Sequence, residues 1–389
     1  MIDTAKGFQD FTGEEALKRE KIKEILIKNF KIFGFEPVET PIIEYEEFVK
    51  GNNEFDEAVS DIFKLKDRGE RNLALRYEFT FQLKRLANNK KLPYKRYQIG
   101  EVFRDEPTSS NRFREFTQCD VDTVGSSVKD EAEILALISK IYKELGIKFK
   151  IKVNNRKLLN SVIKNLGIEN TEFVLREIDK LDKQGEDLVK SSLAKFIDKD
   201  KIIKLFKILG KNLNSFKKFE GYKELKELIE LCKIYKTKID FQPTLARGLS
   251  YYNGSVFEVK TQGMKETIAA GGSYSINNIQ STGISFGLER VSQLSKIKLN
   301  EKKILIISIG QDKKAVSLAE KIRKQGISCS IFYGQPSKAL DYANSLNIPY
   351  VIFIGKDEVK KKKIKLKDMK TGKEKLMSEK QLIEELKLQ

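Results

Sequence analysis

The segment over residues 103–122, FRDEPTSSNRFREFTQCDVD, constrains the fold of this chain more than any other part of the sequence. Its two halves flank a short polar tip, PTSSN, at residues 107–111. Tight connections between antiparallel strands favour such residues, so the segment predicts a hairpin. Charged and aromatic residues alternate on both sides of the tip: Arg104, Asp105, Glu106, Arg112, Arg114 and Glu115, with Phe103, Phe113 and Phe116.

These residue types together have a chemical meaning. A guanidinium group presents a planar fork to phosphate oxygens, a carboxylate accepts from an exocyclic amine, and a flat ring stacks on a base. We interpret the segment as a nucleotide site on paired strands. A solvent-exposed hairpin held by surface salt bridges is the alternative interpretation.

Length and composition indicate a globular protein of two or three domains, at ~150 residues each. Of the 389 residues, 40% are hydrophobic and 33% are charged, which is typical of a folded chain. No apolar run approaches the ~20 residues that a membrane span requires, and the N-terminus has no signal segment. Three cysteines, far apart and without CxxC spacing, indicate isolated thiols. We therefore expect a cytoplasmic protein without a membrane partner.

The charge balance has two notable features. The formal net charge of +18 suggests a polyanionic partner, although a lysine-rich proteome would produce the same excess. Histidine is absent from the chain, so the usual general base and the commonest metal ligand are missing. Phosphoryl and nucleotidyl transfer suit that constraint, because both depend mainly on positioning and electrostatics.

The order of predicted elements favours a mixed α/β (α+β) architecture. Apolar spacing predicts helices over residues 14–33, 79–89 and 130–146, an extended segment over 35–45, and a hairpin from 61–66 and 71–76. Residues 156–236 predict several helices that break at Gly167, Gly185, Gly210 and Gly221. Strands follow, with a turn at Gly271–Gly272 and a strand that runs into a helix over 281–294. From residue 303 strands and helices alternate, as in a small α/β domain.

Several of these segments resemble a known family. GFEPVETPIIE, FRDE…RFREF and GISFGLERV resemble the three motifs of the class II aminoacyl-tRNA synthetases. LARGLSYYNGSVFEV, LRYEFT and REFTQCDVDTVG resemble histidyl-tRNA synthetases, specifically those of the archaeal–eukaryotic type. The resemblance covers nearly the whole chain. It implies an antiparallel-sheet catalytic core over 1–155 and 237–298, a helical insertion over 156–236, and an anticodon-binding α/β domain over 303–389.

The resemblance also implies a function and a set of ATP-binding residues. The chain would join L-histidine to tRNA(His) with ATP and Mg²⁺ through a histidyl-adenylate, as a cytoplasmic homodimer. Arg104 and Arg247 would be the catalytic residues, facing each other across the α-phosphate. Glu106 would contact the adenine edge, Phe116 and Arg290 would stack on its two sides, and Arg112 would reach the γ-phosphate. Ligands for the metal are not assigned.

The residues implied for histidine are Glu78, Thr80 and Gln118 at the α-ammonium group, and Asp122 and Tyr252 at the two imidazole nitrogens. Tyr274 would lie nearby, and Arg247 would also border this pocket. The sequence departs from the family in glycine-rich segments: Ser250 replaces Asp of RGLDYY, and Ser273 and Ser275 replace Arg and Asp of GGRYD. One hypothesis is that an Arg–Asp ion-pair set was lost together.

Two other functions are compatible with the same fold. A non-catalytic synthetase paralogue that regulates histidine biosynthesis usually lacks the C-terminal domain and degrades the ATP motifs. A plain RNA-binding protein on an inactive synthetase fold is the third hypothesis. The five arginine and glutamate residues implied for ATP favour the ligase: Arg104, Glu106, Arg112, Arg247 and Arg290.

Overall fold

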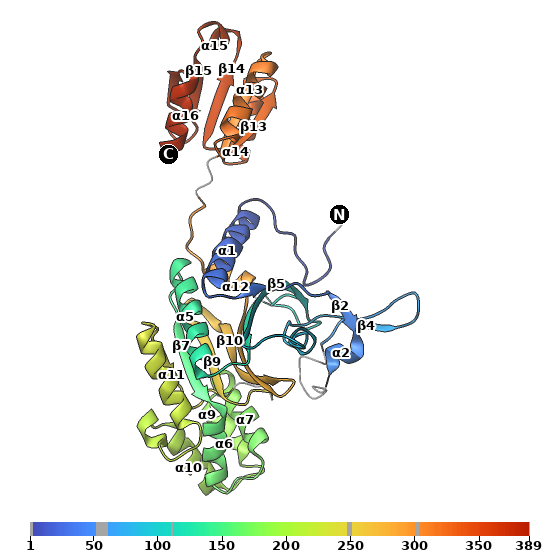
Figure 1. Cartoon of the computed structure of the whole chain (residues 1–389), viewed down its shortest axis with the longest axis vertical. Helices are drawn as coiled ribbons and strands as arrows, with labels where there is room; N and C mark the ends of the chain where they lie inside the picture. The colour runs from blue at the N-terminus through green and yellow to red at the C-terminus, as the bar shows by residue number, and fades with distance from the viewer. Residues whose placement is uncertain (1–2, 52–60, 110–111, 247–250, 300–302, 389) are drawn as a thin grey trace. The chain divides into compact units, whose positions relative to one another are not determined.

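The structure is a computed structural model that describes residues 3–51, 61–109, 112–246, 251–299 and 303–388. The chain divides into two compact units, Met1–Ile297 and Lys298–Gln389 (Figure 1). Arg247 and Ser250 lie outside the described residues. No helix in the described ranges is long and apolar enough to span a membrane.

The first unit is built on an eight-stranded sheet with the order β1-β5-β6-β11-β10-β9-β7-β8. Neighbouring strands are antiparallel, except that β1 pairs in parallel with β5 and β8 pairs in parallel with β7 at the two edges. The mixed fold with an antiparallel core is therefore confirmed. The strands are β1 Glu36–Pro37, β5 Tyr94–Phe103, β6 Glu115–Val124, β7 Lys150–Asn155, β8 Ile239–Phe241, β9 Ser255–Thr261, β10 Met264–Ile276 and β11 Ile279–Gly287.

One face of this sheet packs against helices α1 (Gly13–Ile32), α5 (Val128–Glu144), α11 (Tyr222–Ile234) and α12 (Leu288–Leu294). The predicted first helix is confirmed: Ile22, Leu26 and Phe30 are buried at helical spacing. Cys119 and Val121 of β6 belong to the same apolar cluster. Because side chains alternate along a strand, the even-numbered residues 116–122 of β6 lie on the opposite face.

A small sheet of three strands lies beside the large one, with the order β2-β4-β3. Its strands are β2 Ile43–Tyr45, β3 Lys64–Lys66 and β4 Asn72–Leu75. The short helix α2 Glu46–Lys50 directly follows β2 in the chain. The predicted hairpin is confirmed. Asp67 stabilises its turn, because Oδ1 accepts from the backbone N–H groups of Gly69 and Arg71.

Two local predictions were wrong. The helix predicted over 79–89 is one turn, α4 (Leu83–Leu86), because the residues before it are held by side-chain contacts described below. The turn predicted at Gly271–Gly272 lies inside β10. A Cβ atom at Gly271 would lie 2.1 Å from the carbonyl oxygen of Gly283 on β11. The absence of a side chain at Gly271 therefore allows β10 and β11 to lie close together.

The helical segment after β7 has two parts with different packing. Helices α6 (Arg156–Asn165), α7 (Thr171–Asp179), α8 (Leu181–Gln184), α9 (Glu186–Leu193), α10 (Lys199–Leu209) and a 3₁₀ turn at Leu213–Phe216 share an apolar core of their own. The predicted breaks at Gly167, Gly185, Gly210 and Gly221 all lie between helices. By contrast, α11 packs on α5 and contributes Leu225, Leu228 and Cys232 to the core of the large sheet.

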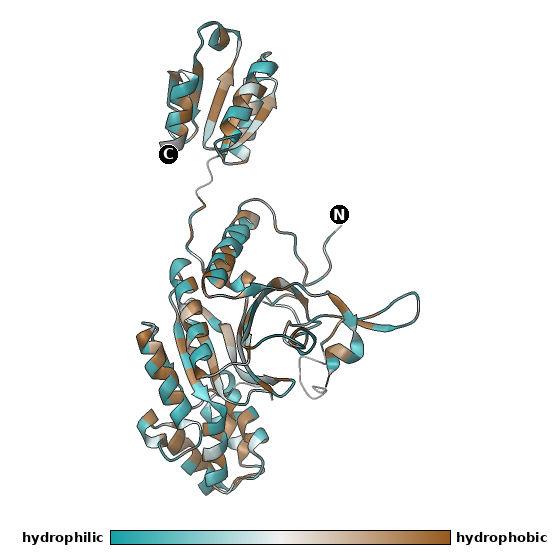
Figure 2. Cartoon of the chain, in the orientation of Figure 1, coloured by the Kyte–Doolittle hydropathy of each residue, from teal (hydrophilic) through white to brown (hydrophobic). Residues whose placement is uncertain are grey.

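The second unit is a five-stranded sheet with the order β13-β12-β14-β15-β16. Its elements are β12 Lys303–Ser308, α13 Asp312–Arg323, β13 Ser328–Tyr333, α14 Pro336–Ser345, β14 Tyr350–Ile354, α15 Lys356–Lys360, β15 Ile364–Asp368, β16 Glu374–Met377 and α16 Glu379–Leu388. Helices α13 and α16 cover one face and α14 the other. Figure 2 shows the central strand β14 as hydrophobic and much of the flanking helical surface as hydrophilic. The predicted α/β domain is confirmed.

The three cysteines are free thiols, as predicted.

Candidate functional site

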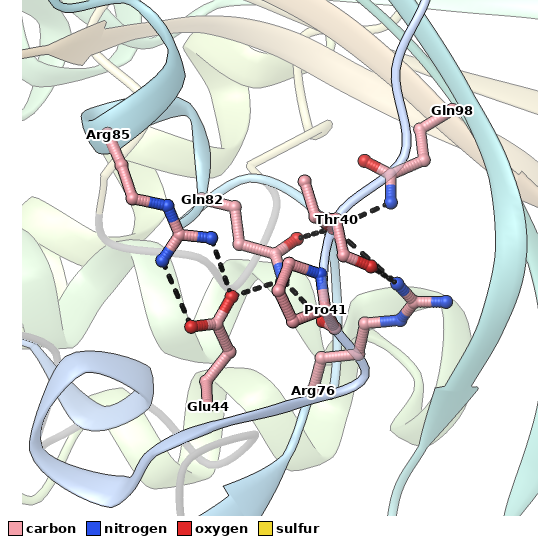
Figure 3. Close-up of polar contacts among 7 residues, drawn as sticks. All are labelled: Thr40, Pro41, Glu44, Arg76, Gln82, Arg85 and Gln98. Carbon is pink, nitrogen blue, oxygen red and sulfur yellow. Dashed lines mark hydrogen bonds and ion pairs between the residues drawn. The ribbon is translucent and has the colours of Figure 1, made fainter.

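The segment over residues 76–82, which carries Glu78 and Thr80, is anchored at its first residue by Arg76 (Figure 3). Arg76 Nη1 donates to the carbonyl of Thr40 at 2.6 Å, and Nε donates to the carbonyl of Glu101 at 2.7 Å. Burial lowers the pKa of Arg76, while the nearby carboxylates of Glu101 and Glu44 oppose the shift. Arg76 thus joins the segment to the chain before β2 and to β5.

The other end of the segment is anchored by Gln82 (Figure 3). Thr40 Oγ1 donates to Gln82 Oε1 at 2.7 Å, and Gln82 Nε2 donates to Glu44 Oε1 at 3.1 Å. The buried carboxylate of Glu44 also accepts both terminal nitrogens of Arg85, at 2.8 and 3.0 Å. With both ends fixed in this way, the backbone that carries Glu78 and Thr80 has a defined path.

Arg104 directly follows β5 and contacts both the segment over residues 76–82 and strand β6. Its Nε atom donates to the carbonyl of Tyr77 at 3.1 Å, and Nη2 lies 3.5 Å from Gln118 Oε1. The guanidinium carbon lies 5.2 Å from the ring centroid of Phe116. Phe116 and Gln118 are even-numbered residues of β6, on the face away from the helices. Three residues implied for ATP and histidine are therefore in contact.

Other charged residues of the hairpin pair with one another. Arg112 forms an ion pair with Glu106. Arg290 on α12 donates from Nη1 to the carbonyl of Thr267 at 2.8 Å. Burial lowers the pKa of Arg290, and the nearby charge of Glu266 opposes this shift. The positive charges of Arg112 and Arg104 lower the pKa further. Three guanidinium groups thus lie close enough to influence one another, which suits a polyanionic ligand, although Glu106 and Glu266 partly offset their charge.

Asp122 is the centre of a cluster of buried polar side chains on the same face of the sheet. Tyr274 of β10 donates its hydroxyl to Asp122 Oδ1, and Arg96 of β5 lies 2.8 Å from Oδ2. Burial raises the pKa of the Asp122 carboxyl, while Arg96 and the hydrogen bond from Tyr274 oppose that shift. Asp120, also buried, has its pKa raised by burial and by the charge of Asp122.

Two glycines leave space for the side chains of Asp122 and Tyr252. Gly283 of β11 lies opposite Asp122, and Gly272 of β10 lies opposite Gly283. A Cβ atom at Gly283 would lie 2.0 Å from Asp122 Oδ1, and one at Gly272 would lie 2.8 Å from the ring of Tyr252. Side chains at either position would displace a residue implied for the imidazole ring, so both positions require glycine.

Two further predicted residues, Tyr252 and Glu78, border the same region. Tyr252 is buried, and its ring centroid lies 4.7 Å from that of Tyr251, which lies 5.9 Å from that of Tyr274. The pKa of Tyr251 is raised well above its usual value by burial, with the charge of Glu78 among the further causes. Glu78 is therefore near this aromatic group. No group of three or more Cys, Asp or Glu side chains within the described ranges could hold a metal ion.

Sequence reasoning did not identify Arg76, Arg96, Gly272 or Gly283 as parts of this site. Arg76 lies within the segment LRYEFT, but the resemblance implies no role for it. Arg96 could have been found from the predicted hairpin, because antiparallel register places it opposite Asp122. Local propensity favours a turn at Gly272 and indicates nothing specific for Gly283, because the sequence does not show which side chains approach them.

The departures at Ser273 and Ser275 have separate surroundings. Ser273 is buried and donates its hydroxyl to Glu131 on α5. Ser275 is exposed, and its Oγ lies 3.4 Å from Asn253 Nδ2. Ser250, the third departure, lies outside the described residues, so the loss of an Arg–Asp ion-pair set stays a hypothesis.

Comparison with known proteins agrees with this geometry. The family model for histidyl-tRNA synthetase matches residues 7–291, and the model for an anticodon-binding domain matches residues 303–389. Histidine–tRNA ligase 1 of Bacillus cereus (strain ATCC 10987) is 34% identical over 412 residues, which cover 96% of this chain and 94% of that protein.

Solved structures show the same fold. The crystal structure of histidyl-tRNA synthetase from Nostoc sp. PCC 7120 superimposes with a TM-score of 0.88 at 26% identity, covering 100% of this chain and 99% of that one. A Bacillus halodurans protein described as an ATP phosphoribosyltransferase regulatory subunit/histidyl-tRNA synthetase has a TM-score of 0.76 and covers 89% of this chain and 96% of its own. At 20% identity it shows likeness of fold alone. From the full-length match to family models and relatives, the chain belongs to the histidyl-tRNA synthetase family.

Proposed function

We propose that this chain is a histidine–tRNA ligase, which joins L-histidine to tRNA(His) with ATP through a histidyl-adenylate. One observation carries the proposal: Arg104, Phe116 and Gln118 lie on the same sheet face as the buried polar cluster of Asp122 and Tyr274. A cationic, aromatic surface for a nucleotide therefore adjoins a polar pocket for a small side chain.

The chemistry of adenylation suits a site without histidine. The carboxylate of a free amino acid, with a pKa near ~3.5, is already ionised at neutral pH, so no general base is needed. The site must bring this carboxylate and the triphosphate together despite their repulsion. In our proposal Arg104 and Arg247 neutralise the α-phosphate, where negative charge accumulates in the transition state.

The other proposed ATP contacts follow from position and residue type. Phe116 stacks on adenine from the hairpin side, and Arg290 lies on the other side of the ring. Glu106 accepts from the adenine amine, and Arg112 binds the γ-phosphate. Because Arg112 and Glu106 are paired here, ATP binding has to exchange that ion pair for contacts to the nucleotide.

Selection of histidine falls to the pocket around Asp122. A neutral imidazole carries one donor and one acceptor, so Asp122 and Tyr252 can each address one ring nitrogen. Glu78, Thr80 and Gln118 bind the α-ammonium group. A site that satisfies both polar ends of a side chain rejects apolar analogues by ~10⁴ or more, which makes editing unnecessary.

The proposal also covers the metal ion, the tRNA, the oligomeric state and the cellular compartment. Mg²⁺ would enter with ATP, since it usually binds through substrate phosphates and one or two carboxylates. Residues 303–389 would bind the anticodon of the tRNA, and the lysine-rich surface would contact its phosphates. We also propose a cytoplasmic homodimer. The archaeal–eukaryotic subtype stays a prediction, and the curated relative cited above is bacterial.

Histidine-dependent exchange of ATP and pyrophosphate tests this function, followed by charging of tRNA(His) with labelled histidine. The ligase predicts both activities, with exchange strictly dependent on histidine. A regulatory paralogue or an RNA-binding protein would show neither. The chain carries the C-terminal domain that such a paralogue usually lacks, which favours the ligase.

A further inference from the structure

A buried guanidinium lies directly beside the pocket proposed for histidine. Arg96 lies on β5 opposite Asp122 of β6 and is fully buried. Its Nη2 atom lies 2.8 Å from Asp122 Oδ2 and donates to the carbonyl of Phe79 at 3.1 Å. Among the described residues, its Nε and Nη1 atoms have no hydrogen-bond partner. Burying an arginine is costly unless a carboxylate compensates its charge, so Asp122 and Arg96 depend on each other.

The two contacts of Arg96 join opposite ends of the proposed substrate. Phe79 lies between Glu78 and Thr80, which we assign to the α-ammonium group, and Asp122 is assigned to the imidazole. One side chain therefore sets the distance between the ammonium-binding segment and the imidazole-binding strand. Lengthening or shortening that link would misplace one end of histidine relative to the other.

The charge of Arg96 acts on two carboxylates, although it forms an ion pair only with Asp122 among the described residues. Asp120, on the same face of β6 as Asp122, accepts from Gln118 Nε2 at 3.0 Å. Burial raises the pKa of both carboxyls, and the charge of Arg96 opposes the shift at each. Without that charge both acids would tend to hold protons. Three further polar groups on the same or neighbouring strands lie near Arg96, Asp120 and Asp122: Tyr94, Tyr274 and Ser285.

We propose that Arg96 is the positioning residue of the histidine pocket, which keeps Asp122 ionised and oriented as the acceptor for an imidazole N–H. This inference rests on the proposed function, because it assigns a role within the same site. A carboxylate has about four acceptor positions, so contacts with Arg96 and Tyr274 leave capacity for the substrate. A protonated Asp122 would donate instead, and the pocket would lose its preference for a ring N–H at that point.

Three variants measured by pyrophosphate exchange test the role of Arg96. Arg96→Met removes the charge and keeps much of the volume, whereas Arg96→Lys keeps the charge and loses the fork. Arg156→Met is the matched control, because Arg156 is also buried and pairs with Glu172 at 2.6 Å within the helical segment. Each variant is assayed at varied histidine and varied ATP between pH 6 and 8, beside thermal unfolding.

We expect Arg96→Met to raise KM for histidine about tenfold or more, a loss equal to one pKa unit of interaction, with little change in KM for ATP. Arg96→Lys should recover part of the affinity, and the pH dependence of KM for histidine should differ from wild type only in the Arg96 variants. Arg156→Met should lose stability without these changes. A KM for histidine that stays at the wild-type value in folded Arg96→Met would overturn the inference.

A second-site variant separates charge from packing. In Arg96→Met/Asp120→Asn one of the two unpaired acids is removed, so Asp122 ionises more easily and histidine affinity should partly return. An equal or weaker affinity in the double variant would mean that Arg96 acts by packing alone. If Arg96→Met is too unstable to purify, KM for histidine is compared between Arg96→Lys and Arg156→Lys. A raised KM in Arg96→Lys alone supports the inference, and equal KM values overturn it.

Failure of the proposed function is distinguishable from failure of this inference. Wild-type protein without any histidine-dependent exchange would refute the ligase itself. Wild-type exchange together with unaltered histidine kinetics in the Arg96 variants would refute only the positioning role.

Discussion

Glu131 is a buried acid that the proposed mechanism does not use. It lies on α5, and its carboxyl accepts from Ser273, the residue before Tyr274. Burial raises its pKa from the ordinary value of 4.5 to about 7, and the charge of Glu224 adds to this effect. The hydrogen bond from Ser273 and the charge of Lys157 oppose it. Folding therefore takes up a proton at this carboxyl in weakly acidic solution.

The sign of the resulting pH dependence follows from linkage. Because the folded pKa is raised, the stability contribution is fully present below about pH 4.5 and is lost as the pH rises through about 7. A shift of this size corresponds to roughly 3 kcal/mol. We expect Glu131→Gln to remove this decline, so that it gains stability over wild type between pH 5 and 8.

Urea unfolding at several pH values measures this difference, with Glu227→Gln on the exposed face of α11 as the control. The control should follow the wild-type curve. Parallel curves for wild type and Glu131→Gln would show that the buried carboxyl is ionised at no cost.

The residues of the site were predictable only where their own chemistry is conspicuous. Asp122, Gln118 and Arg104 stand in a segment whose composition indicates ligand binding, and the structure brings them to one face. Arg96 and Glu131 were not predicted, because a single charged residue on a strand or helix usually faces solvent. Their burial depends on register and packing between elements that are distant in the sequence.

The N-terminal segment supports the hairpin at the level of elements. The carbonyl of Gly7 accepts from the backbone N–H groups of Arg114 at 2.9 Å and of Glu115 at 3.3 Å. Gly7 has a φ of +90°, and a Cβ atom there would lie 2.8 Å from Arg114 Cγ. A glycine is thus required by both backbone conformation and close approach.

We expect Gly7→Val to loosen the base of the hairpin and to raise KM for ATP several-fold, with a smaller effect on KM for histidine. Gly13→Ala is the matched control, since Gly13 also has a positive φ, of +56°, but no atom within 4 Å of its would-be Cβ. Exchange kinetics at varied ATP measure the effect. Equal KM values for ATP in the two variants would show that the segment does not support the ATP site.

At this scale the periodic elements were predictable and the irregular ones were not. Helix α1 and the strand-to-helix run of β11 and α12 follow from spacing and were confirmed. The paired glycines at 271 and 272 favour a turn by local propensity, yet close packing against β11 and Tyr252 places them inside a strand. Segment 76–82 is irregular because its polar contacts with Thr40 and Glu44 outweigh helix propensity.

Several exposed apolar side chains of the first unit are candidates for contact with a second copy. Ile42, Ile43 and Tyr45 are 42%, 50% and 51% exposed, and Ile32 at the end of α1 is 58% exposed. We expect these residues to form the two-fold contact of a homodimer. Ile43→Glu should then give a 44.8 kDa species in light scattering at a concentration where wild type is dimeric.

The control for this experiment is Leu188→Glu, at an exposed apolar position of α9 that the dimer contact does not involve. It should scatter like wild type. Wild-type protein that is itself monomeric at micromolar concentration would contradict the homodimer.

The two units should divide the two steps of the reaction between them. The C-terminal unit has its own apolar clusters on both faces of its sheet, and the residues implied for ATP and histidine all lie in the first unit. We therefore expect deletion of residues 303–389 to leave pyrophosphate exchange near the wild-type rate while tRNA charging falls strongly. A less disruptive variant replaces four lysines by Ala: Lys360, Lys361, Lys362 and Lys363. In this variant tRNA charging should weaken, and the salt dependence of tRNA binding should become shallower because phosphate contacts are lost. Loss of exchange in a folded deletion variant would show that the second unit is needed for adenylation, and unchanged charging would show that it does not bind tRNA.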